Sequence, residues 1–158
     1  MTTDLETQCT PIPSTEELLG ESSETSLVEE LETVIGSLAQ DQKVMFALNE
    51  SGHLWKFKYG TVEVFVQLTG TSDEDTLTVW SFVLPLPAKN EPELMRKLLE
   101  MNWLSTYEAH FGIVDERVTV LCSRTVMDLN PSEISRCVTI VAAIADENDE
   151  KLLAEYGQ

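Results

Sequence analysis

Residues 54–68 have the sequence Leu54-Trp-Lys-Phe-Lys-Tyr-Gly-Thr-Val-Glu-Val-Phe-Val-Gln-Leu68, and this stretch decides the fold class. Its first half alternates Trp55, Phe57 and Tyr59 with lysines, and after Gly60 its second half alternates valines with other residues. A period of two is typical of half-buried strands, and a glycine between two such runs indicates a tight turn. The stretch therefore predicts an antiparallel β-hairpin.

Strand patterns continue on both sides of this hairpin. Val44, Phe46 and Leu48 alternate before it, and residues 76–84 form a fourth apolar run after the loop at 70–75. Residues 107–114 and 117–123 predict two more strands, joined by a tight turn at 115–116. Together they indicate an antiparallel sheet of about five to six strands.

Three segments have a helical period instead. In residues 26–39 apolar residues recur so that they form one stripe, a second helix opens at Pro92, and Asn130 caps a long helix over 131–156. The order α-β-β-β-β-α-β-β-α, without a repeat, predicts a single α+β domain over residues 24–158.

The first 23 residues are biased toward Pro, Ser, Gly and Glu, which predicts a disordered acidic N-terminal tail. Ten acidic residues and no base precede Lys43. Two interpretations stay open: a tail that only increases solubility, and an acidic arm that shields a basic or apolar client surface.

Composition excludes several classes of function. The chain of 158 residues carries a net charge of −18, and its ten Lys and Arg residues are scattered, whereas nucleic-acid binding needs clustered bases. The same charge disfavours anionic membranes, and the longest apolar run, 137–145, is too short to span a bilayer. The acidic N-terminus does not resemble a signal peptide, so we expect a cytoplasmic protein with no nucleic-acid or membrane partner.

The sequence offers no recognisable reaction centre. His53, placed in a turn, and His110 do not lie in a zinc-binding spacing, and the cysteines lack a C-x-x-C motif. Cys122 and Cys137 are expected to be core residues, and the acidic run 146–150 lacks the glycine of a calcium-binding loop. We therefore predict no catalytic residue, no metal ligand, no cofactor and no enzymatic activity.

An excess of apolar residues on the fourth strand is the feature most informative about function. Leu77, Val79 and Val83 supply one apolar face, but the opposite face is apolar too, although an antiparallel sheet usually has one polar face. This second face is the candidate protein-binding surface and comprises Phe65, Trp80, Phe82, Leu84 and Leu121. Alternatively, a loop or the N-terminal segment covers it, or it forms a homodimer interface.

Four segments carry a family resemblance over about residues 43–153. Leu98-Leu-Glu-Met-Asn-Trp103, the hairpin at 110–120, Asp128-Leu-Asn-Pro-Ser-Glu133 and the segment 142–152 resemble the YbjN family. The layout is similar to the type III secretion chaperone-like fold, with three helices on an antiparallel sheet. Residues 54–60 resemble versions found in cyanobacteria and plastids.

The resemblance implies a non-enzymatic regulator of sensory transduction, and the secretion-chaperone relatives imply dimers that bind clients. Three hypotheses follow from the sequence and this resemblance together. The chain is a chaperone-like or adaptor protein with an unidentified protein client; a small-molecule sensor whose pocket is lined by Trp55, Tyr59 and Trp103; or a purely structural homodimer.

Overall fold

The computed structural model describes residues 15–158, with side chains described from residue 27 onward. The elements follow the predicted order and comprise α1 (Thr15–Leu38), the short 3-10 helix η1 (Gln40–Gln42), β1 (Val44–Asn49), β2 (Gly52–Tyr59), β3 (Val62–Leu68), β4 (Thr76–Pro85), α2 (Glu91–Leu104), β5 (His110–Val114), β6 (Arg117–Thr125) and α3 (Pro131–Tyr156). The prediction of an α+β fold with three helices and a sheet of up to six strands is confirmed.

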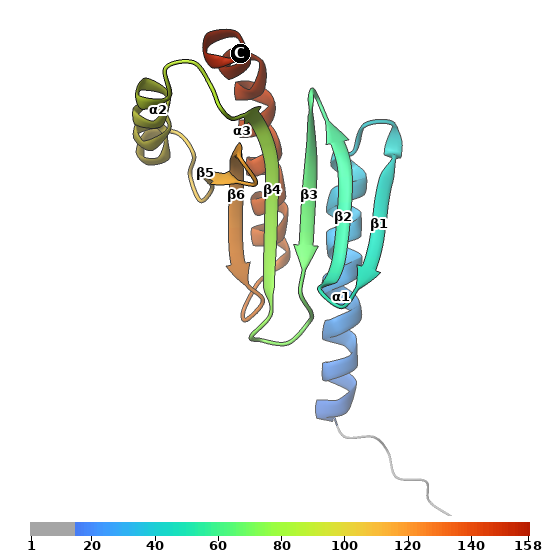
Figure 1. Cartoon of the computed structure of the whole chain (residues 1–158). Helices are drawn as coiled ribbons and strands as arrows, with labels where there is room; N and C mark the ends of the chain where they lie inside the picture. The colour runs from blue at the N-terminus through green and yellow to red at the C-terminus, as the bar shows by residue number, and fades with distance from the viewer. Residues whose placement is uncertain (1–14) are drawn as a thin grey trace, which may run out of the picture.

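The six strands form one antiparallel sheet in the order β1-β2-β3-β4-β6-β5. In the predicted hairpin, Phe57 pairs with Val64 and Tyr59 with Val62. Helices α1 and α3 lie behind the sheet, and α2 lies at its far end beside β5 (Figure 1). One face is therefore covered by two helices. The opposite face, called here the open face, has no described helix over it.

The core lies between the sheet and the two covering helices. Trp55 and Val64 from the sheet and Leu31 from α1 are all buried, as is Val141 from α3. In the first half of α3 the apolar side chains pack against α1 and against β3, β4 and β6, while Arg136 and Thr139 on its other side are exposed. Cys122 and Cys137 are both buried in this layer, so the prediction that they are core residues is confirmed.

The acidic run in the second half of α3 anchors the hairpin turn. The backbone N–H of Thr61 donates to Asp146 (2.9 Å), and the Thr61 hydroxyl donates to Asp149 (2.7 Å). Gly60 adopts a positive φ of 56°, and a Cβ at this position would collide with the Asp146 carboxylate. Two acids of the run 146–150 thus fix the β2–β3 turn on α3.

The boundaries at the N-terminus differ from the prediction. The helix α1 begins at Thr15 rather than near residue 26, so residues 15–23 of the expected tail belong to a helix. Residues 1–14 lie outside the described residues, and for them the acidic tail stays a prediction.

Two strand boundaries also differ from the prediction. His53, expected in a turn, lies within β2. The fifth strand begins at His110, not at 107, because Tyr107 adopts a positive φ of 53° before it.

One predicted surface residue, Leu84, is in the core. The pairing of β4 with β6 shifts register between Phe82 and Leu84, so Phe82 lies opposite Thr119 and Leu84 opposite Val118. This β-bulge reverses the alternation of side chains, since an extra residue moves everything after it to the other face. Leu84 is 1% exposed, and the assignment of Leu84 to the second apolar face is therefore wrong.

Candidate protein-binding surface

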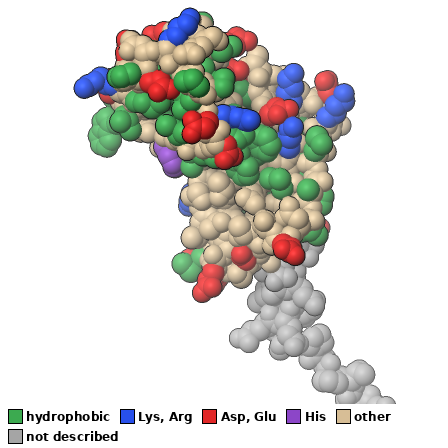
Figure 2. Space-filling view, viewed as in Figure 1, with side chains coloured by type: hydrophobic (Ala, Val, Ile, Leu, Met, Phe, Trp, Pro, Cys, Tyr) green, Lys and Arg blue, Asp and Glu red, His purple; other side chains and the backbone are tan. Residues whose placement is uncertain are grey.

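The other four predicted surface residues come together on the open face of the sheet. Phe65 pairs with Trp80 across β3 and β4, and Trp80 pairs with Leu121 across β4 and β6. Phe82 follows on the same face of β4. All four side chains are partly exposed. Figure 2, which views this face, shows hydrophobic side chains gathered over its upper half, with both basic and acidic side chains among them.

The aromatic rings of this group contact one another directly. The rings of Phe65 and Trp80 are stacked, with centroids 5.4 Å apart and planes inclined by 9°. Phe82 meets Phe65 edge-on, at 5.7 Å and 67°. Such pairs stabilise a sheet by about 0.5–1.5 kcal/mol beyond their buried area, so the cluster is ordered before anything binds to it. We call Phe65, Trp80, Phe82 and Leu121 the aromatic cluster.

Two cationic side chains lie over the rims of the aromatic cluster. The Arg117 guanidinium lies 4.6 Å from the centroid of the Phe82 ring, and Lys56 Nζ lies 5.7 Å from that of Phe65. Lys56 also forms an ion pair with Glu63 at 3.3 Å. Cations over aromatic faces are attracted to the ring electrons. The cluster therefore has a basic rim although the whole chain carries a net charge of −18.

The three residues proposed to line a sensor pocket do not meet. Trp55 is 1% exposed in β2, and Tyr59 is partly buried at the end of the same strand. Trp103 is 88% exposed and belongs to α2, at the opposite end of the sheet. The predicted pocket of Trp55, Tyr59 and Trp103 is thus absent from the described part of the chain.

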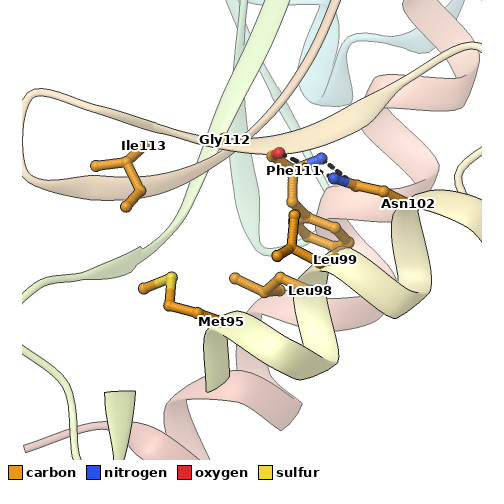
Figure 3. A pocket seen from close by; sticks show the side chains of 7 residues that line it. All are labelled: Met95, Leu98, Leu99, Asn102, Phe111, Gly112 and Ile113. Carbon is orange, nitrogen blue, oxygen red and sulfur yellow. Dashed lines mark hydrogen bonds between the residues drawn. The ribbon is translucent and has the colours of Figure 1, made fainter. Parts of the chain in front are cut away.

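A different hollow, of about 300 Å³, lies between α2 and β5. Figure 3 shows its apolar side chains, which include Met95 and Leu98 from α2 and Phe111 from β5. The amide of Asn102 is its main polar group, and that amide is already engaged. Its Oδ1 accepts the Phe111 N–H at 2.6 Å, and its Nδ2 donates to the Phe111 carbonyl at 3.3 Å. The hollow is thus apolar, with little to orient a polar metabolite.

Asn102 ends the segment Leu98-Leu-Glu-Met-Asn102, whose spacing carried part of the family resemblance without a known role. The structure supplies that role, since the side chain clamps the end of α2 to the edge strand β5. We predict that Asn102→Ala lowers the free energy of unfolding by about 1–3 kcal/mol, because it leaves a partly buried N–H unpaired. Hydrogen exchange at the Phe111 amide should accelerate in this variant, and unchanged exchange would contradict the clamp.

The side chains of residues 27–158 include no metal-binding group, and the Cys137 thiol stays protonated. Their His, Cys, Asp and Glu residues form no group that could bind a metal ion. A hydrogen bond with Cys122 and burial raise the pKa of the Cys137 thiol, which keeps it protonated. No helix in the described part of the chain combines the length and apolarity needed to cross a bilayer.

The fold of this chain is similar to that of chains in two solved structures. A chain of the ExsC–ExsE complex matches with a TM-score of 0.51 and 13% identity, covering 80% of this chain and 93% of that one. A chain of the HopA1–SchA chaperone–effector complex matches with a TM-score of 0.51 and 12% identity, covering 89% and 99%. The predicted type III secretion chaperone-like fold is confirmed.

The sequence then assigns the family. The model of the YbjN family, described as "Putative bacterial sensory transduction regulator", matches residues 27–154. The chain therefore belongs to the YbjN family, as its segments at 98–103, 110–120 and 128–133 predicted. A search of curated proteins found no match.

Proposed function

We propose that this chain is a non-enzymatic protein-binding domain, a chaperone-like or regulatory adaptor, which receives its client on the open face of the sheet. The observation that carries this proposal is the aromatic cluster of Phe65, Trp80, Phe82 and Leu121, which no described helix covers. The fold it shares with chains of the ExsC–ExsE and HopA1–SchA complexes supports a role in binding proteins.

The chemistry of the cluster suits a protein partner. Large aromatic side chains and arginine dominate the binding energy of protein interfaces, and here Trp80, Phe82 and Arg117 lie together. Because the rings already pack against each other, a client that covers them gains apolar burial with little additional ordering of side chains. Basic groups at the rim then favour a client segment that carries acidic residues around its apolar contact.

The alternative functions have less support. A small-molecule sensor needs convergent polar groups in a pocket, whereas the hollow between α2 and β5 has one amide, already bonded to Phe111. A structural homodimer would use the open face as its own interface and bury the aromatic cluster against a second copy of the chain. In that case the purified protein would sediment as a dimer and retain no other protein.

Affinity capture from the native lysate tests the proposal. The tagged wild-type chain should retain a specific protein, and the double variant Trp80→Ser, Phe82→Ser should lose it, because the two substitutions remove the main apolar contacts. Circular dichroism on both baits checks that the variant is folded, which we expect since both side chains are already partly exposed.

The matched control for this capture is Leu99→Ser, Trp103→Ser, which removes exposed apolar side chains from α2 instead. We expect this control to retain the same protein as the wild type. Loss of the protein from the α2 variant alone would move the binding surface to α2. A capture that retains nothing specific on any bait would contradict the proposed function.

A further inference from the structure

The edge strand β1 presents apolar side chains to solvent on both of its faces. Met45 is 68% exposed on the open face, and Phe46 and Leu48 are 53% and 65% exposed on the helix side. β1 pairs only with β2 among the described strands, so its outer backbone edge is unpaired. Proteins usually protect such an edge with charges, proline or a covering loop, and residues 44–49 contain no charged residue and no proline.

Behind β1, buried polar atoms lack partners. The indole N–H of Trp55 and Nδ1 of His53 are inaccessible to solvent and form no hydrogen bond with any described residue. Both rings pack with Phe46: its centroid lies 5.5 Å from Trp55 and 5.9 Å from His53. A buried, unpaired N–H costs about 1–3 kcal/mol, so the sheet is less well stabilised here, and the Trp55 indole reports on any change in the packing of Phe46.

Trp55 lines a hollow of about 260 Å³ between α1 and β1. Ile35, Val44 and Phe46 supply its apolar lining, and Glu32 of α1 stands at its rim as an exposed acid. No Lys or Arg occurs in the chain before Lys43, so the α1 side of this hollow is acidic. An apolar groove with an acidic wall selects for a segment that combines apolar and basic side chains.

We propose that β1 and α1 form a second docking surface, which takes an extended basic and apolar segment of a partner protein as a seventh strand of the sheet. Backbone pairing with the free edge of β1 supplies affinity, and alternate side chains of the segment reach the hollow beside Phe46. Basic side chains of the segment face Glu32, and its apolar side chains enter the hollow whose wall includes Trp55. This inference rests on the proposed protein-binding function and adds a surface and a partner chemistry to it.

The second copy of this chain is the less suitable occupant. Two-fold pairing of β1 with β1 would bring together two chains that each carry a net charge of −18, and with them two acidic α1 helices. A basic segment gains from the same charge that opposes self-association. The experiment must therefore separate a basic strand, an acidic strand and self-association.

The probes are three capped hexapeptides, titrated into the isotopically labelled full chain. One alternates Lys and Val, the second has the same composition in two blocks, and the third alternates Glu and Val. The readout is the indole N–H resonance of Trp55, assigned with Trp80→Phe and Trp103→Phe variants, together with exchange protection of the β1 amides. We expect the alternating Lys–Val peptide to move the Trp55 resonance and protect β1, and the other two to do neither.

Matched variants test the contacts. Glu32→Lys should weaken the Lys–Val peptide by about fivefold, whereas Glu100→Lys on α2, with the same change in net charge, should leave it unchanged. Phe46→Lys, at an exposed position, should abolish the effect on Trp55. Equal binding of the blocked or acidic peptide, an unmoved Trp55 resonance or protection of β1 by self-association alone would each overturn the inference.

These outcomes are independent of the lysate capture. If a client is retained through the aromatic cluster but no peptide reaches Trp55, the β1 surface is wrong and the proposed function stands. If the Lys–Val peptide binds at β1 while the capture is empty, the chain has this docking surface without the client expected on the open face.

Discussion

Truncation of Leu84 to alanine should lower the free energy of unfolding by about 2–5 kcal/mol, whereas Phe82→Ala, two residues earlier on the same strand, should cost only about 1 kcal/mol. Leu84 is 1% exposed and lies among core residues such as Val118, so its removal leaves a cavity. Phe82 is partly exposed on the open face, where its ring contacts Phe65 and Arg117. Urea unfolding followed by circular dichroism measures both values. The dependence of the unfolding free energy on urea concentration should be the same in the variants as in the wild type.

This comparison tests the β-bulge as well as the two side chains. A regular strand places residues 82 and 84 on the same face and would give the two truncations similar costs. The bulge places them on opposite faces, so their costs should differ several-fold. Equal losses of stability would mean either that the bulge is absent or that the open face is covered, and both would undermine the proposed binding surface.

Leu84 also illustrates what the sequence could not predict. The hairpin at 54–68 was predictable because Trp55 and Phe57, then Val64 and Val66, alternate without interruption on one face. On β4 no glycine or other local signal marks the bulge, so the alternation was extended one residue too far. Which face a side chain of β4 occupies after the bulge depends on the pairing with β6, a strand more than thirty residues away in sequence.

Strand order was equally hidden from the sequence. The alternation of Val44, Phe46 and Leu48 predicted a strand, yet only the sheet order shows that β1 lies at an edge and that these side chains are exposed. The prediction that Trp103 lines a pocket with Trp55 was wrong because it also depended on the strand order: α2 packs beside β5 and not near Trp55. The Asn102 clamp was missed because its partner is the backbone of Phe111, which no side-chain pattern reports.

The candidate surface was predictable in outline because it depends on composition more than on geometry. Trp80 and Phe82 on the face opposite Val79 already violated the usual polar face of a covered antiparallel sheet. The structure adds the stacking of Phe65 on Trp80 and the cations over the rims, Lys56 and Arg117, which lie on other strands. The basic rim could not be predicted from the sequence, because Lys56 and Arg117 reach the aromatic rings only through the pairing of their strands with β3 and β4.

Removing the aromatic cluster should strongly weaken binding of the client. Truncating one aromatic hot spot costs an interface about 2 kcal/mol or more, and the costs at neighbouring hot spots do not add in full, so removing both Trp80 and Phe82 should weaken binding about 100-fold or more. The loss should appear mainly as faster dissociation, because the Lys56 and Arg117 rim that steers association remains. Replacing Arg117 by glutamine should instead reduce the association rate and its dependence on salt.

Binding of the client to the open face is measured by the dissociation constant of the captured protein, determined with purified components for three forms of the chain. We expect the Trp80→Ser, Phe82→Ser variant to bind about 100-fold more weakly or worse, and the Leu99→Ser, Trp103→Ser variant to bind as the wild type does. Equal affinity of the wild type and the folded Trp80→Ser, Phe82→Ser variant would contradict the claim that the open face of the sheet binds the client.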